Sequence, residues 1–195
     1  MIRLTLCAAL VAAAFGAQAQ TTGSTVQRDV NQQQRIENGL KDGGLTTKEA
    51  GKLEREEANI DRMQSKDLKN GSLSPQEKAR LQKAQNQASR DIARAEHNSV
   101  NGNPNSASSQ RMQADVQRNI NQDKRIENGV QNGSLTNREV AKLEHGQAKV
   151  DRMEANAAHN GKVGAGEQHR VQHAENVQSK RIHHQKHDAQ QRQPG

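Results

Sequence analysis

The chain has almost no cysteine and almost no Phe, Tyr or Trp. Its 195 residues include one cysteine, Cys7, and one aromatic residue, Phe15, and both lie within the first twenty positions. A chain that loses this segment by cleavage has no thiol, which excludes disulfides, thiol nucleophiles and thiolate metal sites. It also has no ring on which a nucleic-acid base could stack, so we predict no nucleic-acid partner.

No apolar run is long enough to cross a bilayer. The run Leu4–Phe15 has about a dozen residues, against roughly 20 for a membrane-spanning helix. Arg3 before it and Ala17-Gln18-Ala19 behind it are typical of a secretory signal peptide. We therefore predict a signal peptide over 1–19, a periplasmic or secreted protein that is not transmembrane, and a mature net charge of about +6, which is +7 without Arg3.

Catalytic motifs are missing as well. The sequence has no Gly-x-Ser-x-Gly elbow and no phosphate-binding glycine loop. We expect adjacent carboxylates such as Glu56 and Glu57 to lie on open helix faces, without the burial that shifts a pKa. The sequence therefore predicts that the protein is not an enzyme and has no catalytic residues.

What the chain does contain is a block written twice, ninety residues apart. Between 26–63 and 116–153, 21 of 38 positions are identical without a gap, so both copies should adopt one fold. The stretch 101–109 between them is uncharged and rich in Gly, Pro, Ser and Asn. It predicts a flexible linker, which we place at 99–113.

A shorter signal, [Asp/Asn]-Gly-x-[Leu/Val]-[Thr/Ser]-x-x-Glu, marks helix ends and starts. It begins at Asp42, Asn70, Asn132 and Asn160. The glycine accepts the left-handed backbone that closes a helix. The hydroxyl residue and the Glu three positions later form a capping box. The predicted boxes are Thr46/Glu49, Ser74/Glu77 and Thr136/Glu139, whereas Gly164 stands at the fourth cap and predicts a looser helix start.

Apolar residues between these signals recur at helical spacing. We therefore predict an all-α protein of two tandem, homologous three-helix modules, over 24–98 and 114–188. Each would be an antiparallel bundle, and a disordered tail over 189–195 would follow the second.

The repeated elements carry two resemblances. With its Arg-Ile-x-x-Gly and Gly-x-Leu-Thr-x-x-Glu elements, the block resembles small exported proteobacterial helical-repeat proteins of unassigned function. The runs 45–49 and 135–139 are also similar to the Leu-Thr-x-x-Gln signature of periplasmic all-helical chaperones and stress sensors. That second resemblance implies a non-enzymatic, chaperone-like function. Its partners would be unfolded client proteins. The surplus of Lys and Arg separately predicts attraction to the anionic envelope surface, and a homo-oligomer is left open.

The repeated loop also resembles a degenerate EF-hand, which would imply calcium. Gly43 and Glu49 then fall on the invariant glycine and the terminal bidentate Glu. The third loop position needs an oxygen donor but holds Leu40 and its counterparts Leu68, Val130 and Ala158. Helix capping explains the glycine and the Glu without a metal.

Histidine pairs suggest a different metal. His169/His173 and His183/His187 are spaced by four residues, which places each pair on one helix face. Such pairs could hold Zn²⁺, Cu²⁺ or Ni²⁺, and the alternative function is then transition-metal sequestration by the second module. A solvated, weakly basic helix face is the simpler interpretation.

Overall fold

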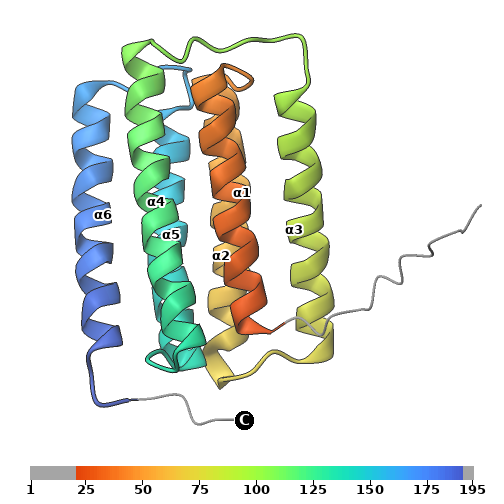
Figure 1. Ribbon diagram of the computed structural model, residues 1–195, viewed down its shortest axis with the longest axis vertical. Helices are drawn as coiled ribbons and strands as arrows, with labels where there is room; N and C mark the ends of the chain where they lie inside the picture. The colour runs from red at the N-terminus through yellow and green to blue at the C-terminus, as the bar shows by residue number, and fades with distance from the viewer. Residues whose placement is uncertain (1–20, 191–195) are drawn as a thin grey trace, which may run out of the picture.

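A computed structural model describes residues 21–190, so the predicted signal peptide over 1–19 and residues 191–195 of the predicted tail lie outside it. The predicted all-α class is confirmed, because every regular element in the described range is helical (Figure 1). The elements are α1 (Thr22–Asp42), α2 (Thr47–Asp67), a 3-10 turn (Leu68–Asn70), α3 (Pro75–Glu96), α4 (Ala107–Gln131), α5 (Asn137–Ala157) and α6 (Ala165–Lys186).

The predicted capping boxes form the starts of three helices. The Thr46 hydroxyl accepts a hydrogen bond from the Glu49 backbone N–H, and Glu49 Oε2 accepts one from the Thr46 backbone N–H at 3.0 Å. The same box starts α3 and α5. At α6, Gly164 has no capping side chain, and only the reciprocal bond to Glu167 Oε2 remains. The helix boundaries are therefore set locally, as the motif predicts.

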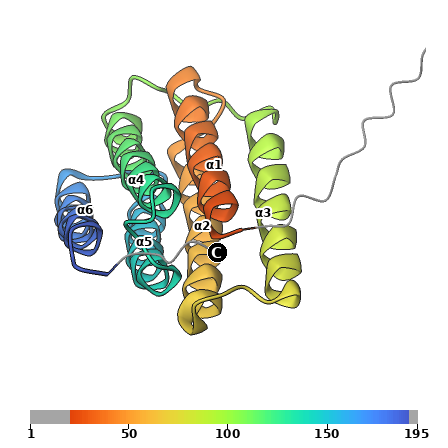
Figure 2. The ribbon, with the colours of Figure 1, turned by 60° about the horizontal axis from the view of Figure 1, so that its bottom comes forward.

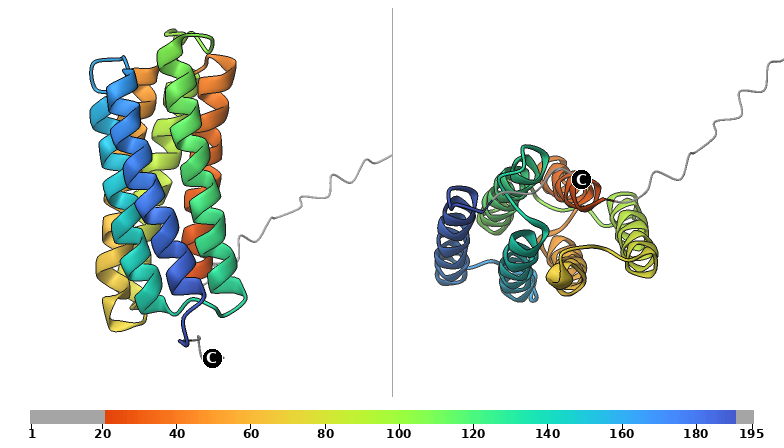
Figure 3. Two further views of the ribbon diagram at one scale, coloured as in Figure 1. Left: turned by 90° about the vertical axis from the view of Figure 1, so that its left-hand side faces the viewer. Right: turned by 90° about the horizontal axis from the view of Figure 1, so that it is seen from below.

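The helices pack as a central group of four with one helix on each flank. α1 lies beside α4 and α2 beside α5, with α3 outside α1 and α2 and α6 outside α4 and α5. Seen along the bundle, α4 and α1 form one row and α5 and α2 the other (Figure 3, right). A tilted view shows the same order (Figure 2).

Each hydrophobic cluster is built from both copies of the repeat. One joins Ile36 and Leu40 to Met112, Val116 and Ile120, residues of α1 and α4. The other joins Val26 and Leu68 to Ile126, Val130 and Ile182. The prediction of two separate modules is therefore not confirmed. The helices of the two copies pack on each other, α1 on α4 and α2 on α5, and share one interior.

The connection between the copies is shorter than predicted and is held in place. α4 begins at Ala107, so the linker prediction is wrong for 107–113. The Gly102 N–H donates to the Gly43 carbonyl at 2.8 Å, and Asn98 Nδ2 donates to Glu49 Oε1 at 2.7 Å. Within residues 21–190, no helix is both long and apolar enough to span a bilayer.

Candidate metal centre

The interior of the four central helices is acidic. Eight carboxylates point into it from all four helices, and each has 7% or less of its surface exposed. We call this group the acidic core; it comprises Asp29, Glu54, Glu57, Asp61, Asp123, Glu144, Asp151 and Glu154. These residues share the core-facing helix stripes with the aliphatic residues, so the same packing that buries Leu53 and Ile60 buries them.

Two groups of three carboxylates in this core have the spacing of a metal site. The first triad is Asp29, Asp61 and Glu144, and the second is Glu54, Asp151 and Glu154. In each triad, one oxygen from every residue lies within 4.8 Å of the others. Oxygens on opposite sides of a calcium ion at 2.3–2.6 Å are about 5 Å apart, so each triad could close around one such ion.

Buried amides hold the carboxylates of both triads. In the first, Gln64 Nε2 donates to Asp29 Oδ2 at 2.5 Å. In the second, Asn119 Nδ2 lies 3.0 Å from Asp151 Oδ1 and 2.9 Å from Glu154 Oε2. These contacts fix the orientation of the carboxylates, as ligand-positioning groups do around metals.

The acidic core has more hydrogen-bond acceptors than donors. The carbonyl oxygens of the positioning amides Gln64 and Asn119 are buried without a partner, as is Glu144 Oε1. Unpaired buried oxygens also include Gln33 Oε1, Glu54 Oε1, both Glu57 oxygens and Gln147 Oε1. Unpaired buried acceptors cost free energy, and a proton or a bound cation would satisfy several of these oxygens at once.

Within the described residues the acidic core has no buried positive side chain, and the charge of Arg28 only partly offsets the burial of Asp29. The buried polar residues between 21 and 190 include no Lys, Arg or His. The ion pairs of that range involve residues outside both triads, such as Arg35–Glu96 and Arg80–Asp67. Buried carboxylates without a counter-ion must bind protons or a cation, because ionised carboxylates are costly to desolvate.

Burial raises the pKa values of the core carboxyl groups. It raises the pKa of Asp29 and of Glu54 to about 7, partly offset by hydrogen bonds from Gln64 and Gln33 respectively. Burial followed by repulsion from neighbouring acids raises the pKa of Asp61 and of Glu144 well above the usual range. In the cation-free protein the core is therefore substantially protonated near neutral pH.

The repeat relates the two triads to each other with one exchange. Glu54 corresponds to Glu144 and Asp61 to Asp151. Asp29 corresponds to Asn119, and Gln64 corresponds to Glu154. In the first copy the carboxylate is on α1 and the amide on α2, whereas in the second copy the amide is on α4 and the carboxylate on α5. Each triad consequently keeps three carboxylates and one adjacent amide, although the third carboxylate comes from a different helix.

Sequence reasoning missed this centre, and one expectation about it was wrong. Glu57 does not lie on an open face: it is 2% exposed, and burial and nearby acids raise its pKa well above the usual range. Glu56 is half-buried, and burial and then Asp91 raise its pKa to about 7. The sequence signal was acidic residues at helical spacing within the apolar stripe of α2, as at Glu54, Glu57 and Asp61.

The structure does not bring the predicted histidine ligands together with this core. All four lie exposed on α6: His169, His173, His183 and His187. The His183 and His187 rings are 4.2 Å apart, and His187 Nδ1 contacts the His183 carbonyl oxygen. Between residues 21 and 190, neither group of three close candidate ligands includes a histidine.

In the EF-hand-like loops, the side chain of the terminal Glu caps the helix that follows. Oε2 of Glu49 and of Glu139 accepts hydrogen bonds from both the backbone N–H and the hydroxyl of its cap threonine. Gly43, Gly71, Gly133 and Gly161 adopt left-handed φ values of 80–93° at the helix ends. Capping therefore accounts for the geometry of the repeated loop.

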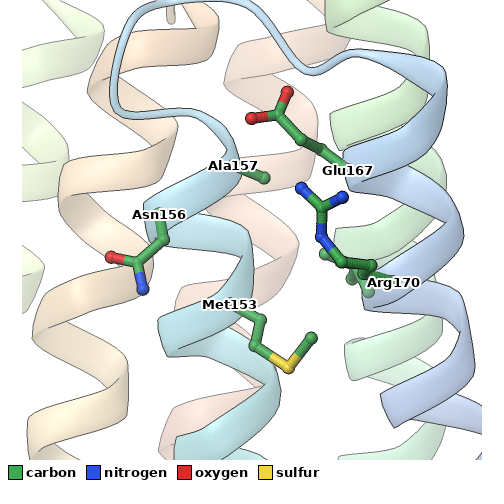
Figure 4. Close-up of a pocket in the computed structure, with 6 residues that line it drawn as sticks. Met153, Asn156, Ala157, Glu167 and Arg170 are labelled. Atoms are coloured by element: carbon green, nitrogen blue, oxygen red, sulfur yellow. The ribbon is translucent and has the colours of Figure 1, made fainter.

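A surface pocket between α5 and α6 is separate from the acidic core (Figure 4). Its volume is about 220 Å³, and Met153, Ala157 and Arg170 contribute to its wall. Arg170 extends its guanidinium toward the gap between the two helices, while Glu167 is engaged as the cap of α6. The pocket holds no pair of groups arranged for acid–base chemistry.

No known protein family, curated protein or solved structure matches this chain. The chaperone, EF-hand and helical-repeat resemblances therefore stay predictions, and the function must be argued from the chain's own residues.

Proposed function

We propose that this protein is a non-enzymatic binder of hard divalent cations, which the acidic core holds at its two carboxylate triads. The observation that carries the proposal is the pairing of each triad with a buried amide whose carbonyl oxygen has no partner. Carboxylate clusters alone are common, but this one combines a surplus of buried acceptors with the lack of any buried Lys, Arg or His among the described residues, which favours a cation as occupant.

The donor set favours cations that prefer oxygen. The triads and their amides offer only carboxylate and amide oxygens, with no imidazole and no thiolate. Carboxylate and carbonyl ligands suit Ca²⁺, Mn²⁺ and Mg²⁺, whereas Zn²⁺ and Cu²⁺ sites commonly use nitrogen or sulfur. Mg²⁺ sheds its water reluctantly, so a buried site built only from protein oxygens favours Ca²⁺ or Mn²⁺.

Amide rotation would complete the coordination. Asn119 contacts the second triad through Nδ2, and a half-turn of its amide group would present Oδ1 instead. Gln64 offers the same exchange beside Asp29. Bidentate carboxylates and one amide oxygen then supply the six or more oxygens that Ca²⁺ requires.

Cation binding would exchange with protons. Because burial raises the pKa of Asp29 and Glu54 to about 7, a cation that binds near neutral pH must displace protons from the core. The protein would therefore hold cations at neutral and alkaline pH and release them on acidification.

The structure offers the chaperone prediction less support. Between residues 21 and 190, the exposed large aliphatic side chains are Val100 and Val177, so the apolar stripes face the interior. Client capture through those stripes would require the bundle to open.

The test is cation titration of the full chain after exhaustive chelation. Calorimetry with Ca²⁺ and with Mn²⁺ at pH 7.5 should show saturable binding with proton release, measured as a dependence of the heat on the buffer's ionisation enthalpy. Far-UV circular dichroism should show a higher melting temperature, because a ligand at a hundred times its Kd stabilises the folded state by about 2.7 kcal/mol.

Two variants separate the acidic core from other sites. Asp61→Asn combined with Asp151→Asn should abolish the calcium heat. Replacement of the four α6 histidines, His169, His173, His183 and His187, by Gln should leave it unchanged. Absence of binding up to 1 mM of either cation, with unchanged melting, would refute the proposal and leave protons as the occupant of the core.

A further inference from the structure

The outer surface of α2 and α5 is as uniformly basic as their inner surface is acidic. The exposed positions of α2 follow each other at spacings of four and three: Lys48, Lys52, Arg55, Asn59, Arg62, Lys66 and Lys69. The equivalent exposed positions of α5 are Arg138, Lys142, His145, Lys149, Arg152, Asn156 and His159. We call these fourteen residues the basic face.

The basic face concentrates charge beyond the average of the chain. It carries ten of the 29 Lys and Arg residues and no carboxylate, while the whole chain has a net charge of +7. The outer surface of α1 and α4 differs. Its exposed positions are largely amides, including Asn31, Asn38, Asn121 and Asn128, and only Lys41, Arg118 and Lys124 are exposed cations there.

The two rows of cations lie side by side and border two shallow hollows. One, of about 470 Å³, is bordered by Lys48, Lys52, Arg55 and Glu56 of α2 with His159, which follows α5. The other, of about 370 Å³, is bordered by Lys69, which follows α2, with Arg138, Lys142 and His145 of α5. The repeat relates the two hollows, so the face presents the same chemistry at both of its ends.

The cations are close enough to influence each other. Partial burial lowers the pKa of His145, and Lys149, Lys69, Arg62 and Arg181 lower it further. A carboxylate near the face, Glu56, is half-buried and interacts with Asp91 and Arg94 of α3. The cations of the face outnumber this carboxylate, so the face has a positive potential, which attracts anions.

We infer that the basic face docks the protein onto an anionic lipid membrane surface. The two helices, each of 21 residues, lie side by side and form a face about 30 Å long and 20 Å wide. A face of this size suits a planar sheet of phosphate head groups. The side chains of the face are cations and amides with no large apolar anchor. The protein would therefore lie on the head groups without inserting, held by charge alone.

The same dimensions disfavour double-stranded DNA. A major groove about 12 Å wide admits one helix, whereas this face presents two helices side by side. The face also has no Phe, Tyr or Trp ring for base stacking. DNA would contact the face only through phosphates along one ridge, with fewer cations engaged than on a planar surface.

The test is co-sedimentation of the full chain with vesicles. Phosphatidylcholine vesicles containing 30% phosphatidylglycerol should bind the protein in 50 mM NaCl. Pure phosphatidylcholine vesicles should not, and 0.5 M NaCl should release it, because screening shortens the reach of the charges. Replacing Lys48, Lys52, Lys142 and Lys149 by Gln should weaken binding to anionic vesicles at least ten-fold.

A charge-matched variant decides whether the face or the net charge acts. Lys41→Gln, Lys83→Gln, Lys124→Gln and Lys180→Gln removes four exposed lysines outside the face and should change binding less than two-fold. Equal losses in the two variants, no binding to anionic vesicles, or tighter binding to duplex DNA than to vesicles would each overturn the inference. Far-UV circular dichroism at 20 °C checks that both variants remain folded.

Discussion

Asp61 and Asp151 occupy the same position in the two copies of the repeat and share a hydrogen bond in the middle of the bundle. Each is at most 4% exposed, and each belongs to a different carboxylate triad. Two carboxyl groups can share such a bond only when one is protonated, or they can together face a cation. This contact joins the two triads and makes the acidic core one coupled unit.

The cation-free protein should become less stable as the pH rises. The folded-state pKa of Asp29 is raised to about 7 from 3.8, and that of Glu54 to about 7 from 4.5. Their contribution is fully present below pH 4 and is lost as the pH rises through 7, because the unfolded chain releases these protons earlier. Urea unfolding with EDTA, followed by circular dichroism, should give a free energy of unfolding about 5 kcal/mol lower at pH 8 than at pH 5, with about half from each group. A constant or rising value over this range would contradict the proposed protonation.

Asp61→Asn should stabilise the cation-free protein and weaken the cation-bound one. The substitution removes the free-energy cost of keeping a buried carboxyl group protonated at pH 7.5, and it keeps the side-chain volume and a group that can hydrogen-bond Asp151. We expect the free energy of unfolding at pH 7.5 in EDTA to rise by about 2 kcal/mol. The stabilisation by 5 mM CaCl₂ should shrink to less than half. As a control, Asp42→Asn at an exposed helix end should change either value by no more than about 0.5 kcal/mol. Destabilisation by Asp61→Asn in EDTA would mean that the ionised carboxylate is itself favourable.

Glu154→Gln and Glu139→Gln separate the second triad from the EF-hand-like loop. Glu154 belongs to that triad, whereas Glu139 caps α5. Calorimetry should therefore show the calcium stoichiometry fall by half in Glu154→Gln and stay unchanged in Glu139→Gln. Glu139→Gln should cost at most about 1 kcal/mol in stability, since Gln also completes a capping box. The reverse pattern would favour the loop as the calcium site.

Gly102→Ala should show that the connection between the copies is structural. A Cβ at position 102 would lie 2.1 Å from the Leu45 carbonyl oxygen, so backbone would have to move. We expect a loss of about 2 kcal/mol in the free energy of unfolding. Gly166→Ala lies in the first turn of α6, where a Cβ would meet only the Arg170 side chain at 3.9 Å, and should instead stabilise by about 0.5 kcal/mol. Equal effects of the two substitutions would indicate that segment 97–106 is not held against α1 and α2.

Local interactions made the helices predictable from the sequence. Thr46 with Glu49 and Thr136 with Glu139 bond within four residues of each other, so their capping boxes form wherever the chain goes. Gly43 and Gly133 end the preceding helices for the same local reason. The apolar spacing likewise shows which stripe of each helix is buried, and the all-α class follows from these features.

Only the tertiary structure determined which buried helix faces pack against each other. The sequence favours helices of one copy packing on each other, but pairing α1 with α4 and α2 with α5 buries the stripes of both copies against their counterparts. The same pairing brings Asp61 to Asp151 and Glu144 to Asp29, residues 83 or more positions apart. The sequence does not predict this contact, because the residues become buried and close to each other only when the bundle assembles. The duplication and the caps were therefore determined by sequence alone, whereas the acidic core exists only where the two copies meet.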